Sequence, residues 1–149
     1  MNNFDYDFSF ITFFKPLASL FDHRYQLAKR SNALDKFDEA LLSAMDEILR
    51  YTLGDICTQI IYDYLERISI PRSEIPNKLD RFSEELRKLL GDGKGQILGS
   101  APILEEAIAE RLCAKLGVRM QSRLSMAFSI FVRKLKEDYH SEEKRTPSQ

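Results

Sequence analysis

The sequence predicts an all-α protein, a compact helical bundle of about five to six helices. Apolar residues recur at intervals of three and four along most of the chain, which is the period of a helix that buries one face. The six glycines and five prolines mostly lie between these stretches and mark the ends of helices. Because 44% of the 149 residues are hydrophobic, the chain can bury a core of its own.

The first 30 residues are predicted to form an aromatic-rich segment followed by a helix. Aromatic side chains alternate with Asp and Ser from Phe4 to Phe10, which indicates an extended backbone, and a helical period follows over residues 16–30. The six aromatic residues among the first 14 are Phe4, Tyr6, Phe8, Phe10, Phe13 and Phe14. We expect them to pack in the bundle core or across a dimer, and a docking peptide for another protein is the alternative.

Residues 31–117 are predicted to form a helical core domain. Two helices open it. The first is expected to be capped by Ser31 or Asn32 and to end at Gly54. The second is expected to be capped by Asp55 and to extend to Ile68. Each helix carries an apolar stripe that we expect to face the core. The first stripe contains Leu34, Phe37, Leu41, Ala44, Ile48 and Tyr51, and the second contains Ile56, Cys57, Ile60, Ile61, Tyr64, Leu65 and Ile68.

Prolines and glycines divide the rest of the core domain. Pro71 and Pro76 predict a connector, because each proline disfavours a continuing helix. A helix that begins at Asn77 or Asp80 is expected to end at Gly91. The glycine-rich run from Gly91 to Ser100 is predicted to be a flexible connector. After it, Ser100, Pro102 and two glutamates predict the start of a helix that stops at Gly117.

The last region is predicted to be a basic amphipathic helix over residues 118–140, followed by a disordered tail over residues 141–149. Residues 118–136 contain five cations and no acid, although the whole chain has a net charge of -1. These cations are Arg119, Arg123, Arg133, Lys134 and Lys136. The apolar side of the same helix, with Phe128, Phe131 and Leu135, is a candidate packing or dimer surface. Such a helix either docks on acidic protein, a phosphate backbone or a membrane surface, or packs in the bundle with its polar side in solvent.

No residue pattern points to catalysis or to a metal. His23 and His140 are the only histidines, and Cys57 and Cys113 are not spaced as a metal-binding pair. Neighbouring carboxylates on a helix point about 100° apart, so they do not form a two-carboxylate site. We therefore expect no enzyme activity and no cofactor. The chain lacks a basic signal-like start and a run of about 20 apolar residues, so we expect a cytoplasmic protein without a membrane span.

About residues 33–117 resemble an archaeal family, the Nitrosopumilus-type output domain, formerly a domain of unknown function. The residues that carry the resemblance are Tyr64 and Leu65 at a helix end, Ile75 and Pro76 in the connector, Phe82, Leu86 and Gly91 in the next helix, and Leu116 and Gly117 at the end of the last. The resemblance implies a non-enzymatic archaeal module that is attached to signalling domains and delivers or receives a signal. It brings no catalytic or ligand residues with it.

Two functions follow as expectations. The first is a non-enzymatic interaction module, a signalling output or protein-binding domain whose partner is another protein or a second copy of itself. The alternative is a DNA-binding regulator that contacts phosphates through the basic C-terminal helix. Overall charge does not favour nucleic acid, because 22 basic and 23 acidic residues nearly cancel.

Overall fold

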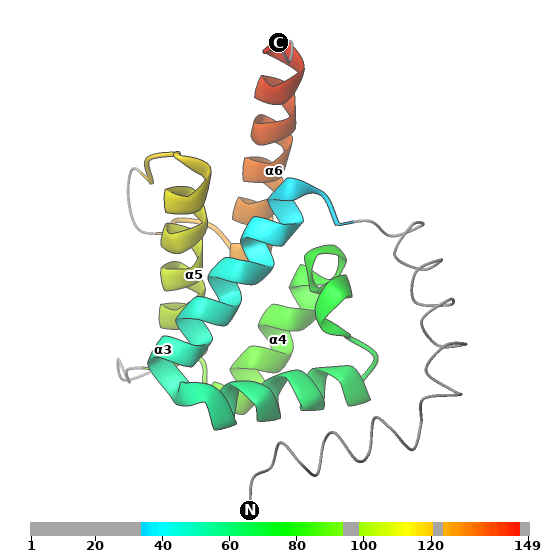
Figure 1. Cartoon of the computed structure of the whole chain (residues 1–149). Helices are drawn as coiled ribbons and strands as arrows, with labels where there is room; N and C mark the ends of the chain where they lie inside the picture. The colour runs from blue at the N-terminus through cyan, green and yellow to red at the C-terminus, as the bar shows by residue number, and fades with distance from the viewer. Residues whose placement is uncertain (1–33, 94–98, 121–123, 147–149) are drawn as a thin grey trace, which may run out of the picture. The chain divides into compact units, whose positions relative to one another are not determined.

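The computed structural model describes residues 34–93, 99–120 and 124–146, and within them it confirms the all-α prediction. Four α-helices and one short 3-10 helix follow one another along these parts of the chain, and none of their residues is in a strand (Figure 1). The aromatic segment and the helix predicted over residues 1–30 lie outside the described residues. So do the caps Ser31 and Asn32, residues 94–98 of the glycine-rich connector, and Arg123.

Helix α3 (Lys36–Arg67) combines the first two predicted helices of the core domain. Its N-cap is Asp35 rather than Ser31 or Asn32, and the Asp35 carboxylate accepts a hydrogen bond from the Asp38 N–H at 2.8 Å. The predicted break at Gly54 is present as a kink, since Gly54 has φ 83° and ψ 168°. Figure 1 shows the sharp change of direction that results. A side chain would be strained in this conformation, so glycine permits the bend.

The proline connector contains one element that was not predicted. Residues Arg72–Asn77 form the 3-10 helix η1, with Pro76 inside it. Ile70 and Ile75, on either side of its start, are fully buried, so the connector contributes to the core. Helix α4 (Leu79–Leu90) follows and ends at Gly91 as predicted.

Helix α5 (Ala101–Leu116) agrees with the prediction at both ends. Ser100 is its N-cap, and Gly117 ends it in the left-handed conformation with φ 70°. The Ala101 N–H donates a hydrogen bond to the Gly91 carbonyl at 3.1 Å. The end of α4 and the start of α5 therefore lie next to each other.

Helix α6 (Phe128–Arg145) differs from the prediction at both ends. It begins nine residues after Arg119, and residues 119–120 and 124–127 are not helical. It also continues through residues 141–145, which were predicted to be a disordered tail. The apolar spacing of Met120 and Leu124 fits a helix, but only the part from Phe128 onward finds buried positions for its apolar side chains.

The core lies where α3 packs along α5, with α4 and η1 beside them and α6 across α4 and α5. The largest side chains that are almost fully buried come from every helix and include Phe37, Leu41, Met45, Leu49, Phe82, Leu104 and Phe128. The bend of α3 and the end of α6 lie at the edges of the packed helices (Figure 1).

Candidate protein-interaction surface

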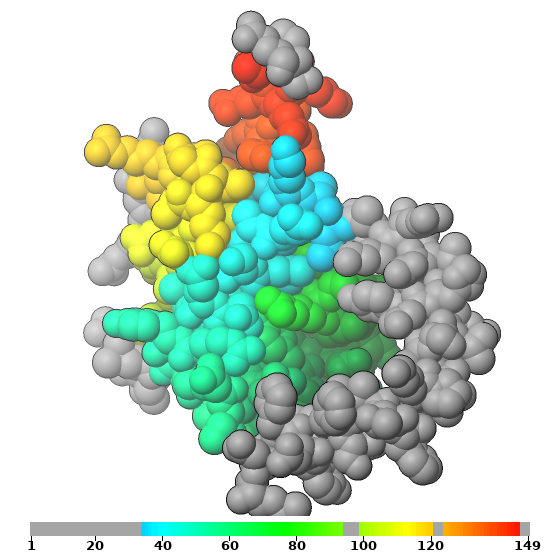
Figure 2. Space-filling model, viewed as in Figure 1, coloured from blue at the N-terminus to red at the C-terminus, as the bar shows by residue number. Residues whose placement is uncertain are grey.

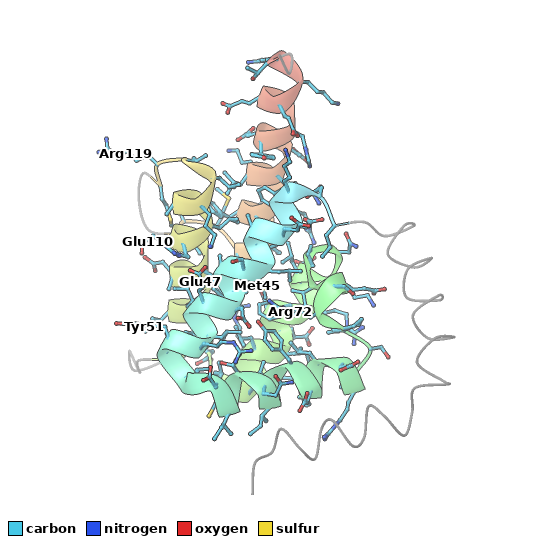
Figure 3. The ribbon with its side chains drawn as sticks, viewed as in Figure 1. Met45, Glu47, Tyr51, Arg72, Glu110 and Arg119 are labelled. Carbon is cyan, nitrogen blue, oxygen red and sulfur yellow. The ribbon has the colours of Figure 1, made fainter. Side chains whose placement is uncertain are left out.

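The bend of α3 carries large apolar side chains that remain in solvent. Tyr51, Ile56 and Ile60 are 90%, 78% and 60% exposed, and we call these three residues the α3 corner. Figure 2 shows that the bend itself is at the surface, and Figure 3 shows Tyr51 pointing away from the helices. Single exposed apolar residues are ordinary, but three at one bend form a candidate contact surface.

The helical period explains why Ile56 and Ile60 point outward. Thr58, Ile61 and Leu65 are the buried residues of α3 after the bend. Ile56 and Ile60 are one helical turn apart from each other and lie on a different face. This part of α3 therefore has one apolar face in the core and a second one in solvent.

Side-chain bonds hold the bend in place. Arg50 donates to Asp46 at 2.9 Å and to Asp55 at 3.0 Å, so its guanidinium bridges the two sides of Gly54. The Thr58 hydroxyl donates to the Gly54 carbonyl at 2.8 Å. The predicted cap Asp55 therefore binds Arg50 instead of closing a helix end. The α3 corner is displayed on a braced bend.

A second polar group braces the inner side of the bend. Arg72 of η1 reaches Asp46 at 3.8 Å and lies over the ring of Tyr62, 5.4 Å from its centroid (Figure 3). Burial of the Tyr62 hydroxyl, together with the nearby Asp46 carboxylate, raises the pKa of Tyr62 to about 12. Tyr62 stays neutral at physiological pH, and the group joins the connector to both halves of α3.

The predicted basic residues do not gather on one helical face. Arg119 is exposed and lies outside α6, and Arg123 lies outside the described residues. Arg133 is paired with Asp80 of α4. Lys136 is paired with Asp38 at 2.8 Å and with Asp35 at 3.4 Å.

Among the described cations of this group, Lys134 and Arg119 make no ion pair with the described residues. The paired cations instead attach α6 to α4 and to the start of α3. Lys136 also lies 5.9 Å from the centroid of the Phe37 ring. Within the described chain, two of the five lysines and arginines of α6 are therefore neutralised inside the domain.

The predicted apolar surface of the last helix is partly buried and partly exposed. Phe128 and Leu135 are buried at 2% and 9% exposure, whereas Phe131 is half-buried and Ile130 is 54% exposed. Phe128 and Leu135 are therefore occupied by packing within the chain. The aromatic candidates Phe4, Tyr6, Phe8, Phe10, Phe13 and Phe14 lie outside the described residues.

Two titratable groups, His140 and Glu105, lie close to charged partners. His140 lies 3.2 Å from Asp35 and 3.7 Å from Glu143, on the side of α6 that faces the start of α3. Glu105 is 3% exposed, burial raises its pKa, and Arg87 lies 3.2 Å from one of its oxygens. The described residues contain no cluster of His, Cys, Asp and Glu suited to a metal ion.

The sequence contained a signal for the α3 corner that the prediction did not use. Tyr51, Ile56 and Ile60 were all placed on inward stripes, and the structure corrects this. The second predicted stripe has seven apolar members in 13 residues, which is wider than one buried face needs. A stripe that wide contains two faces, of which Cys57 and Ile60 lie on the exposed side.

Comparisons with known proteins identify no relatives. No protein-family model matches the chain, and neither curated proteins nor solved structures give a match. Across the helices that the structure describes, none combines the length and apolar character needed to span a membrane.

Proposed function

We propose that this chain is a non-enzymatic helical module that binds another protein through the α3 corner. The observation that carries the proposal is the exposure of Tyr51, Ile56 and Ile60 at a braced bend. Exposed apolar side chains cost free energy in water, and a partner that covers them recovers it.

The free energy gained by covering the α3 corner is expected to be large enough to support binding. Full burial of an isoleucine side chain contributes about 1.5–3 kcal/mol. Ile56 and Ile60 start at 78% and 60% exposure, so a partner can cover most of each side chain. Tyr51 adds an aromatic ring with a hydroxyl, a residue type that is enriched in the centre of protein interfaces.

The resemblance to the archaeal output domain supports a more specific role. In that role the module delivers or receives a signal in the cytoplasm, and its partner is a signalling protein or a second copy of the chain. The braced geometry suits such a role, because a rigid surface loses little conformational entropy on binding.

A photo-crosslinking amino acid placed at position 56 tests the proposal in cells that naturally produce the protein. We expect a discrete crosslinked species that contains a second polypeptide, identified by mass spectrometry as another protein or a second copy. The added substitution Ile60→Glu should remove it, because a carboxylate cannot be buried there without a partner. The same amino acid at position 66, an exposed site on α3, is the matched control. Equal crosslinking from both positions, or none from position 56, rejects the proposal.

DNA binding through α6 is the weaker alternative. Arg133 and Lys136 are engaged with Asp80 and Asp38, so phosphate contacts would have to compete with these ion pairs. A gel-shift assay with duplex DNA at low salt tests it. Salt-sensitive binding that falls with Lys134→Ala would favour this alternative.

A further inference from the structure

A hollow of about 570 Å³ lies between the end of α5 and the C-terminal half of α6. Its apolar lining is Leu116, Val118, Leu135 and Tyr139. Its acidic lining is Asp138, Glu142 and Glu143, accompanied by one cation, Arg145. We call this hollow the α5–α6 groove. It is separate from the α3 corner.

One face of α6 supplies most of the groove. Three lining residues follow Leu135 at intervals of three, four and seven positions, namely Asp138, Tyr139 and Glu142. With Leu135 they lie along one side of the helix. Figure 1 shows the last turns of α6 extending past the beginning of α3. Across from this face, Val118 is 40% exposed. The groove therefore offers apolar and acidic side chains together to an incoming chain.

The lining of the groove is acidic, since three carboxylates face one cation. Asp138 and Glu142 are exposed carboxylates that make no ion pair with the described residues. In addition, α5 ends at Leu116 and α6 ends at Arg145, both in the lining. The carboxyl end of a helix carries a partial negative charge, but Lys115 in the last turn of α5 and Lys144 and Arg145 in the last turn of α6 offset it. The acidic character of the groove therefore comes from its carboxylates.

We propose that the α5–α6 groove binds a basic amphipathic segment of another protein. The apolar face of that segment would cover Val118 and Tyr139, and its lysines or arginines would pair with Asp138 and Glu142. A helix with an apolar stripe and a cationic side has this combination, and helix-in-groove binding is a common mode of peptide recognition. The proposal goes beyond the α3 corner and does not depend on it.

A labelled synthetic peptide tests the proposal with the full chain. The probe is an amphipathic Leu/Lys helix of about 18 residues, about five turns long, and a Leu/Glu peptide of the same length is its control. Fluorescence anisotropy should show saturable binding of the Leu/Lys peptide that weakens as salt is raised, and no binding of the Leu/Glu peptide. No binding of the basic peptide at low salt, or equal binding of both peptides, overturns the proposal.

Variants locate the binding. The double substitution Asp138→Lys and Glu142→Lys should weaken binding of the Leu/Lys peptide by about tenfold or more, equivalent to about 1.4 kcal/mol. Val118→Ser should weaken it by a smaller factor at every salt concentration, because it removes an apolar contact and leaves the charge unchanged. Glu66→Lys, on an exposed acid of α3 far along the chain from the groove, is a charge-reversal control at a second acidic site and should bind as the natural chain does.

Two outcomes contradict the groove specifically. If Glu66→Lys weakens binding as much as the double variant, the attraction is general to the acidic surface. If light scattering shows a dimer of the 17.3 kDa chain that the double variant converts to a monomer, the occupant is a second copy. Because none of these variants touches Tyr51, Ile56 or Ile60, failure here leaves the crosslinking test of the α3 corner independent.

Discussion

The two halves of α3 have similar apolar content but bury it to different extents. Before the bend, Phe37, Leu41, Met45 and Leu49 are completely buried, and this half packs along α5. After the bend, Ile61 and Leu65 are buried while Ile56 and Ile60 are exposed. The helical period is the same in both halves. The difference shows that a neighbouring helix, rather than the pattern of the helix itself, decides which apolar face becomes core.

The largest expected effect comes from truncating one residue in each half. Met45→Ala should lower the free energy of unfolding by about 2–5 kcal/mol, because it leaves a cavity in a packed core. Ile60→Ala should change it by less than about 0.5 kcal/mol, since the side chain is already in water. Urea unfolding followed by circular dichroism measures both. A large loss for Ile60→Ala would mean that the α3 corner is covered in solution.

The next largest effect concerns the residue that separates the halves. Gly54 has φ 83° and ψ 168°, a region that is essentially restricted to glycine, so Gly54→Ala should cost about 1–3 kcal/mol. Beyond the adjoining residues and the nearby helix backbone, no atom lies within 4 Å of the position where a Cβ would be, so the cost is backbone strain and not a clash. Thermal unfolding measures it.

Gly117 provides the control for that strain. It has φ 70° and ψ 21°, the left-handed helical region, which asparagine also adopts. Gly117→Asn should therefore be tolerated better than Gly117→Ala, whereas Gly54→Asn should be no better than Gly54→Ala. Equal rescue by asparagine at both positions would show that the bend does not require glycine.

Glycines predicted three of the helix ends and bends correctly. Gly54, Gly91 and Gly117 mark a bend and two helix ends, because positive φ is a property of single residues that sequence reveals directly. The start of α6 was misplaced, since Met120 and Leu124 have helical spacing without a helix to pack against. Its end was misplaced because Ser141, Glu142 and Glu143 are polar but continue a helix that is already formed.

The candidate surfaces were harder to predict for a physical reason. Exposure of Ile56 depends on which neighbours cover α3, and that is a property of tertiary packing. The pairing of Lys136 with Asp38 joins residues 98 positions apart, a distance that no local pattern reports. The local pattern identified the basic residues as a group, but it did not reveal the acidic residues with which they pair.

A smaller effect, on the pH dependence of stability, is expected to distinguish the two halves of α3. Lys115 and Arg111 of α5 donate to Glu47 in the first half of α3 at 2.5 and 2.6 Å, and these bonds lower the pKa of Glu47 to about 2. An unfolded glutamate has a pKa of about 4.3. The stabilisation is therefore complete above about pH 5 and is lost as the pH falls from there toward 2. Glu47→Gln should flatten the dependence of unfolding temperature on pH in that window.

The matched substitution in the second half of α3 is Glu66→Gln. Glu66 is exposed and makes no ion pair with the described residues, so this change should leave the slope between pH 5 and 2 as it is in the natural chain. The Glu47 effect should also shrink in high salt, because the carboxylate and its partners are partly exposed and their attraction is screened. If both substitutions flatten the slope equally, the pH dependence reflects the net charge of the whole chain. If Glu47→Gln alone does so, the bridge to α5 is what makes the first half of α3 the anchored half.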